Sequence, residues 1–165
     1  MIHHARMTAS VDSEFVVFLI GMRINALWKV HRWVPVVLAM GRMLRELYSQ
    51  PQMGLLHHEM WLSRTIILVQ YWRSKDQLLA YAKSKDAEHL PAWRAFNRAV
   101  GSDGSVGIWH ETYAIAPGSY ENIYNNMPPF GLGKAGRLEP IGRRSESAMQ
   151  RFRSNHPPQS GTDLP

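Results

Sequence analysis

The sequence predicts an α+β domain with the ferredoxin-like order strand, helix, strand, strand, helix, strand. Short strand-like runs recur at 15–25, 55–62, 65–72 and 106–115, and the first and third are rich in β-branched and aromatic residues. Helical periodicity separates the first run from the second and the third from the fourth. Only Ser63 and Arg64 separate the two middle runs, which is typical of a hairpin. Together these observations give the split βαβ arrangement.

The first strand begins as the fully apolar run Phe15–Ile20 and continues after Gly21 as an alternation of apolar and polar residues through Asn25. This pattern indicates a strand that starts buried and ends at an open rim. A helix follows, because apolar residues from Val30 to Tyr48 recur at three- and four-residue steps. Proline is tolerated in a first helical turn, so Pro35 places the predicted helix start near Trp33 or Val34.

The run Thr65–Trp72 is the clearest strand in the chain. Ser74 follows it with Gln77 three positions later, a pairing that predicts a capping box and a helix start. A second helical piece is expected to follow and to end at Gly101. In the last strand, 106–115, His110 shares a face with Ile108 and Thr112, whereas Glu111 faces the other way.

Both predicted helices cover one face of this sheet, and the other face needs a cover. A second copy of the sheet is the simplest cover, so we expect a homodimer. Residues 1–13 and 141–165 are polar and lack periodicity. They are expected to be a flexible arm and a basic disordered tail around one domain at 14–140.

Composition excludes several classes of function. The chain has no cysteine, so thiolate catalysis and iron–sulfur clusters are ruled out. No apolar run approaches the roughly 20 residues of a membrane span, and the first residues do not have the pattern of a signal peptide, so we expect a cytoplasmic protein with no membrane partner. The formal net charge is +6, but five of the 19 Lys and Arg residues crowd the last 30 residues and the others are scattered. No groove-reading motif accompanies this charge, so no nucleic-acid partner is expected.

Several segments of the chain resemble one family of monooxygenase-like proteins within the antibiotic-biosynthesis-monooxygenase superfamily. The segments are Trp72-Arg73-Ser74-Lys75, Phe18 to Asn25, Asp86 to Trp93, Gly107 to Tyr113 and Asn126 to Gly131. The resemblance spans about residues 14–140 and implies a dimeric α/β barrel. One fungal relative is assigned to polyketide oxygenation. The superfamily also contains haem degraders, haem-dependent dehydratases and proteins that only bind ligands.

Two histidines are the candidate catalytic residues. His89 lies where the related haem degraders place their iron-ligating histidine, so the resemblance makes it a haem ligand or a general base. His110 is expected to face the same pocket if Ile108 and Thr112 face the helices. The alternatives are a capping or surface role for His89 and a hydrogen-bonded core role for His110.

Six residues are candidates for substrate binding. Arg23 and Asn25 lie at the end of the first strand, at the rim of the expected pocket, and related oxygenases use an asparagine of this strand. Trp72 and Trp93 flank the predicted His89 helix and are expected to wall a flat apolar ligand. Tyr124 and Asn125 belong to an aromatic loop expected over the pocket mouth. Core packing of the tryptophans and a strand-end turn at Asn25 are the structural alternatives.

Two further motifs carry no function. His57, His58 and Glu59 are adjacent on a strand, so they point to alternating faces and are not expected to hold a metal. The spacing Gly131-x-Gly133-x-x-Gly136 matches a dinucleotide fingerprint but follows no strand.

The sequence leaves three functions open. The first is a cofactor-independent oxygenase acting on an aromatic or polyketide-like substrate, with no cofactor. The second is a haem enzyme with His89 as the axial ligand, and the third is a dimer that binds a small ligand without turnover.

Overall fold

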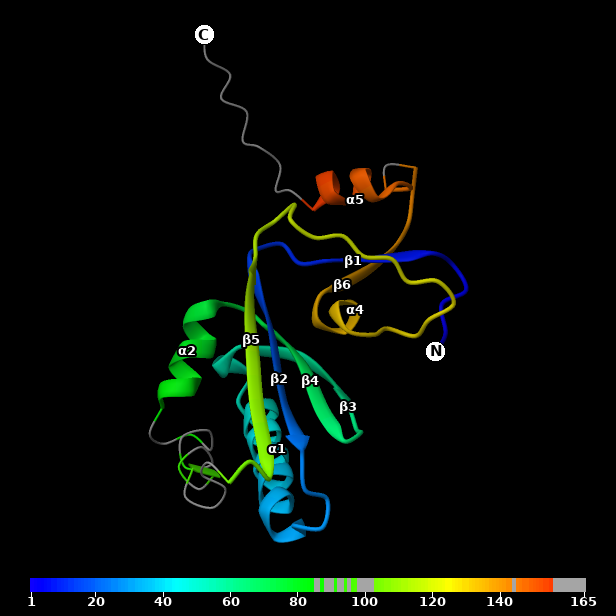
Figure 1. Cartoon of the computed structure of the whole chain (residues 1–165). Helices are drawn as coiled ribbons and strands as arrows, with labels where there is room; N and C mark the ends of the chain where they lie inside the picture. The colour runs from blue at the N-terminus through cyan, green and yellow to red at the C-terminus, as the bar shows by residue number, and fades with distance from the viewer. Residues whose placement is uncertain are drawn as a thin grey trace. The chain divides into compact units, whose positions relative to one another are not determined.

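The structure is a computed structural model that describes residues 1–84, 87, 91, 94, 96–97, 103–143 and 145–155. Its chain divides into two compact units (Figure 1). The sheet unit comprises Val16–Tyr113, and the terminal unit comprises Met1–Phe15 together with Ala114–Pro165. None of the helices in the described part of the chain is long and apolar enough to cross a membrane.

The sheet unit has the predicted ferredoxin-like fold. Its strands are β2 (Phe15–Ile24), β3 (Leu55–Trp61), β4 (Thr65–Trp72) and β5 (Val106–Ile115), arranged in the order β3-β4-β2-β5. The first and third strands of the predicted motif thus form the centre of the sheet, where β2 pairs antiparallel with β4. Helices α1 (Val30–Ser49) and α2 (Lys75–Lys83) follow β2 and β4. The short helix η1 (Pro51–Met53) leads from α1 into β3.

The core lies between one face of this sheet and the two helices. Even-numbered residues of β2 and β4 point to this helix face, as the alternation of a strand requires. The buried cluster there consists of Val16, Leu44, Leu47, Leu55, Leu68, Trp72, Leu78, Tyr81 and Ala87. A second cluster of Met22, Ile24 and Val106 continues it toward the other end of the sheet. We call the opposite side, on which the odd-numbered residues of β2 and β4 lie, the open face.

Helix α1 begins earlier than the sequence predicts. It starts at Val30, so Pro35 lies inside the helix and not in its first turn. Its N-terminus has no side-chain cap, and a backbone hydrogen bond from Arg32 to the Lys29 carbonyl (2.8 Å) closes the first turn. Because proline has no N–H, the helix loses one backbone bond at Pro35, and packing of its apolar stripe compensates for the loss.

Helix α2 begins as predicted at Ser74. The Ser74 hydroxyl accepts the backbone N–H of Gln77 at 3.2 Å. The Gln77 side chain does not complete a capping box, because its amide donates to the Gln52 carbonyl of η1 at 2.9 Å. Ser74 therefore caps the N-terminus of α2, and the Gln77 side chain ties the helix to η1.

The terminal unit differs from the arm and tail that the sequence indicates. Residues 7–10 form β1 (Met7–Ser10), which pairs antiparallel with β6 (Arg137–Pro140). Helix α4 (Leu132–Ala135) precedes β6, and α5 (Ala148–Ser154) opens with a complete capping box formed by Ser147 and Gln150. The Arg151 side chain is buried and donates to Glu121 Oε2 at 2.7 Å. The pairing of β1 with β6 joins segments more than 100 positions apart, so local patterns in the sequence do not reveal it.

Candidate functional site

A small cavity lies in the sheet unit between the helix face of the sheet and the two helices. Its volume is about 40 Å³. The lining residues come from β2, β4, α1 and α2: Phe18, Ile20, Met40, Met43, Leu47, Gln70, Trp72, Leu78 and Tyr81. Most of this wall is aliphatic or aromatic, which is typical of a site for an apolar ligand.

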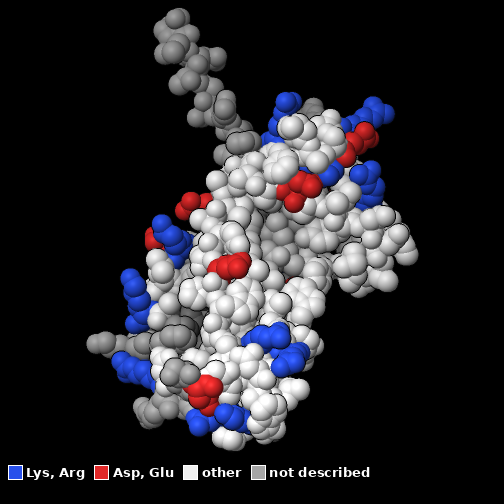
Figure 2. Space-filling model, viewed as in Figure 1, with Lys and Arg blue, Asp and Glu red and all other residues white. Residues whose placement is uncertain are grey.

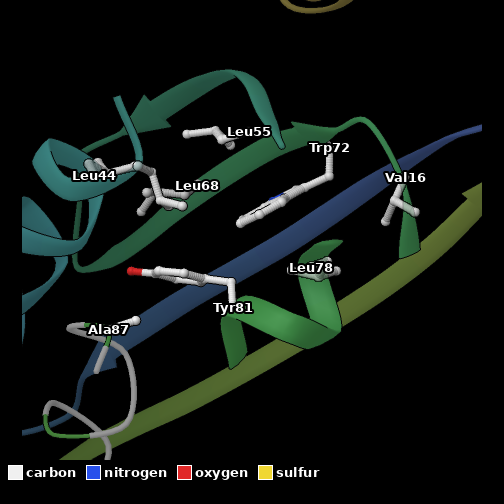
Figure 3. Packing of buried hydrophobic residues seen from close by; sticks show 9 residues of the cluster. Val16, Leu44, Leu55, Leu68, Trp72, Leu78, Tyr81 and Ala87 are labelled. Atoms are coloured by element: carbon white, nitrogen blue, oxygen red, sulfur yellow. The ribbon is translucent and has the colours of Figure 1, made fainter. Parts of the chain in front are cut away.

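Trp72 and Tyr81 form an aromatic pair at this cavity. Figure 3 shows the two side chains projecting from β4 and α2 into the space between sheet and helices. Their ring centroids lie 5.8 Å apart at 38°. The Tyr81 hydroxyl donates to Glu46 Oε2 of α1 at 3.0 Å, which ties α2 to α1. Trp72 is the largest of the fully buried side chains, so its indole is at once a core residue and part of the cavity wall.

Gln70 is the polar side chain that β4 places in this wall. It is only 5% exposed. Its Oε1 accepts the indole N–H of Trp72 at 2.9 Å. Indole nitrogen is a donor only, so this bond fixes which end of the amide faces Trp72. The Nε2 group consequently points away from Trp72, and no hydrogen-bond acceptor meets it among the described residues.

His110 lies on the helix face of β5, as the strand alternation predicts. Its ring lies 5.7 Å from the ring of Phe18, and Phe18 lines the cavity. Phe18 in turn pairs directly with Gln70 across the β2–β4 ladder. His110 itself is exposed. The helix face therefore carries a row of His110, Phe18 and Gln70 that runs from solvent to the cavity.

His58 continues this row on the other side of Gln70. It pairs with Gln70 across the β3–β4 ladder, and its Nδ1 lies 2.7 Å from the Tyr48 hydroxyl of α1. Burial raises the pKa of the Tyr48 phenol. The bond to Tyr48 occupies Nδ1 of the His58 ring.

The structure places two of the candidate binding residues away from the cavity. Arg23 pairs with Thr65 across the ladder and donates to its hydroxyl at 3.0 Å, so it lies on the open face. Asn25 follows the end of β2, and its side chain donates to the Gly104 carbonyl at 2.9 Å. Its backbone N–H also bonds to Ser105. Asn25 thus holds the loop that enters β5, which is the strand-end role.

The remaining candidates fall into three groups. Trp72 lies in the cavity wall. His89 and Trp93 lie outside the described residues. Tyr124 and Asn125 belong to the terminal unit, where the backbone of Tyr124 bridges to Met7 and its hydroxyl accepts the N–H of Gly133 at 3.1 Å. Tyr124 therefore stabilises the terminal unit through these hydrogen bonds. Asn125 is exposed.

Sequence reasoning missed Gln70 and Tyr81. The signal for Gln70 was present: a polar residue in a buried strand, two positions before Trp72 and therefore on the same face. Tyr81 gave no comparable signal, because a tyrosine on a helical stripe has the pattern of an ordinary core residue.

Haem binding through His89 stays a prediction, because His89 lies outside the described residues. No histidine is among the residues that line the described cavity. In the part of the chain that the structure describes, no group of three His, Asp or Glu side chains could hold a metal ion. His57 pairs instead with Glu59 at 3.1 Å, on the open face of β3.

A family comparison identifies the chain. The family described as monooxygenase af470-like matches residues 15–132, most of the chain and all the strands of the four-stranded sheet. The chain belongs to the monooxygenase af470-like family. Comparison with curated proteins gives no match. Members of this family are monooxygenase-like.

Several solved structures are similar to part of this chain at low sequence identity. SnoaB from Streptomyces nogalater, a cofactor-independent oxygenase, is 13% identical with a TM-score of 0.44, covering 61% of this chain and 91% of its own. Rv0793 from Mycobacterium tuberculosis is 12% identical with a TM-score of 0.46, covering 61% and 94%. A dimeric ferredoxin-like protein of unknown function from Jannaschia sp. CCS1 is 17% identical with a TM-score of 0.42, covering 58% and 97%. The family assignment rests on the family match and not on these structures.

Proposed function

We propose that this protein is an oxygenase that acts on an aromatic, polyketide-like substrate held between the helix face of the sheet and helices α1 and α2. The observation that supports this is the cavity itself, a buried aromatic and aliphatic wall containing one oriented amide, in a member of a monooxygenase-like family. An apolar wall selects a flat hydrophobic molecule, and it keeps water from a reactive carbanion.

The proposed reaction needs no redox cofactor. A methylene group flanked by electron-rich rings is oxidised to a ketone: R₂CH₂ + O₂ gives R₂C=O + H₂O. A base removes one methylene proton, and the resulting carbanion passes an electron to oxygen. The two radicals combine to a peroxide, which loses water as the second methylene proton leaves. All four electrons come from the substrate, one oxygen atom enters the ketone, and the other leaves as water.

His110 is the proposed base among the described residues. Imidazole accepts protons near neutral pH, and His110 adjoins Phe18 in the cavity wall. Its exposed position allows it to exchange the proton with solvent. His89, outside the described residues, remains a second proposed base.

Substrate binding must widen the cavity. A space of about 40 Å³ holds a small group but not a fused ring system. Met40 and Met43 of α1 lie in the wall, and methionine repacks more readily than branched or aromatic side chains. We propose that these two side chains move aside when the substrate enters.

Oxygen consumption with a hydroxylated anthrone tests this function. The wild-type protein should consume oxygen above the protein-free rate, and His110→Ala should lower kcat by 10²-fold or more, the usual contribution of a general base. The matched control is His31→Ala, because His31 is exposed on α1 and does not line the cavity. Anthrone binding without oxygen consumption would instead indicate a ligand carrier, and activity unaffected by His110→Ala would exclude His110 as the base.

We further propose a homodimer formed through the open face. Val17, Leu19, Ile67, Val69 and Trp109 lie there half-buried, and the nearby Trp61, Leu62 and Tyr113 are exposed. In Figure 2 most of the surface over β5 is uncharged, with acidic atoms in its middle and basic atoms below them. A sheet face of this composition is stabilised by a second layer. Val69→Glu should yield a monomer in analytical ultracentrifugation, whereas an unchanged sedimentation coefficient would contradict this interface.

A further inference from the structure

We propose that the Gln70 side-chain amide is a ligand-binding group that recognises an aromatic carbonyl or phenolate oxygen inside the cavity. This inference rests on the proposed function, since it names the part of the substrate that the site holds. It makes Gln70 a positioning residue that orients the substrate without taking part in proton transfer.

The orientation of this amide is settled by Trp72. The indole N–H can only donate, and it lies 2.9 Å from Gln70 Oε1. A flipped amide would direct its own N–H₂ group at the indole N–H, so the flipped state is unfavourable. Both Gln70 Nε2 hydrogens are therefore available for another partner.

Among the described residues, no other group takes these hydrogens. The neighbours of Gln70 along its row are Phe18, which has no acceptor, and His58, whose Nδ1 is engaged by Tyr48. Among the described residues, the only side-chain nitrogen that is fully buried without a partner is Arg32 Nε. Gln70 Nε2 thus keeps accessible surface although the residue is 5% exposed, and the cavity that Gln70 lines is the space it faces.

A purely structural role explains the Oε1 atom of Gln70 but not its amino group. Any acceptor at position 70 would satisfy the Trp72 indole, and the extra amino group adds a desolvation penalty of its own unless a partner meets it. A ligand with an acceptor oxygen supplies that partner. The aliphatic and aromatic wall requires the rest of the ligand to be apolar, and the fixed donor selects a carbonyl or phenolate over a cation or an amine.

The test compares acetophenone with ethylbenzene, two probes of similar shape of which only the first carries an acceptor oxygen. Binding is followed by NMR on the ¹⁵N-labelled protein, with the Gln70 side-chain amide and the Trp72 indole resonances as reporters. In the wild type, acetophenone should bind about three- to tenfold more tightly than ethylbenzene, the effect of one neutral hydrogen bond. It should also shift the Gln70 amide resonances.

Two variants separate recognition from folding. Gln70→Glu keeps an acceptor for the Trp72 indole and removes the amide donors, and Gln70→Met removes both functions. In each variant acetophenone and ethylbenzene should bind about equally tightly. Gln52→Glu, at an exposed glutamine outside the cavity, is the matched control and should retain the preference.

Two results would overturn the proposal. The first is an acetophenone preference that survives in both position-70 variants, and the second is an absence of binding of either probe to the wild type at millimolar concentration. Because the assay measures binding alone, it is independent of oxygen consumption. A protein that shows the preference but does not consume oxygen would retain this subsite and lose the oxygenase assignment.

Discussion

Gly21 gives a sharp test of how the sheet is packed, because its neighbours leave no room for a side chain. A Cβ added at this position of β2 would lie 2.6 Å from the Ile66 carbonyl oxygen and 2.7 Å from Trp109 Nε1. The carbonyl belongs to the backbone of the adjacent strand, so it cannot yield without disturbing the β2–β4 ladder. Trp109 could move, but only by leaving its place beside Gly21 on the open face.

Gly21→Ala should therefore destabilise the protein. Overpacking of this kind costs about 1–3 kcal/mol, and the entropy gained from a less flexible unfolded chain offsets about 0.4–1 kcal/mol of it. A net loss of about 1–2 kcal/mol is expected. Urea unfolding followed by circular dichroism should show a midpoint lowered by roughly 0.5–1 M at an unchanged slope.

Gly41→Ala is the matched control. Gly41 lies inside α1, and a Cβ added there meets nothing within 4 Å. Alanine is favoured over glycine in a helix interior, so this variant should gain up to about 1 kcal/mol. An equal or higher urea midpoint for Gly21→Ala than for the wild type would refute the packing described for β2, β4 and Trp109.

Three further outcomes follow from single contacts. Leu68→Ala should lower the free energy of unfolding by about 2–5 kcal/mol in urea titration, since Leu68 is 1% exposed in the core; a loss under 1 kcal/mol would contradict its burial. Arg151→Met should lower the free energy of unfolding by about 1.5–3 kcal/mol and increase hydrogen exchange in α5, because it removes the ion-pair partner of Glu121. Unchanged exchange would contradict that ion pair. Hydrogen bonds from Ser105 lower the pKa of Asp103 to about 2 from 3.8, so the stabilisation is complete above pH 4 and disappears as the pH falls to 2. Thermal unfolding should show the difference between wild type and Asp103→Asn shrinking over that interval, and a constant difference would contradict the shift.

Local patterns were sufficient to predict the sheet unit. Thr65–Trp72 and the Ser74 cap form as the sequence indicates, because both depend on contacts within a few residues. Alternation also predicted that His110 shares a face with Ile108, and the structure places both on the helix face. Such features depend on residues close in the sequence, so a periodicity of two or 3.6 residues predicts them.

The position of Arg23 shows what alternation leaves undetermined. The run Phe15–Ile20 is apolar at every position, so it carries no polar residue to indicate which parity faces the helices. Only the ladder with β4 places Phe18 and Ile20 on the helix face and Arg23 on the open face.

The terminal unit could not be predicted for a different reason. Strands β1 and β6 have four residues each and pair across about 130 positions of chain, as in Ala9 with Leu138. A four-residue strand has too few positions to establish a period, and its stability comes from a partner that the local sequence does not reveal. The same holds for the Gln70 amide, whose orientation is set by a contact and not by a pattern.

The most direct test of the oxygenase assignment is turnover of a hydroxylated anthrone under ¹⁸O₂ without added cofactor. If the protein is such an oxygenase, mass spectrometry should find one ¹⁸O atom in the ketone product. One molecule of oxygen should be consumed for each molecule of ketone formed above the protein-free rate. A product rate equal to the protein-free rate, or a ketone oxygen derived from water, would contradict it.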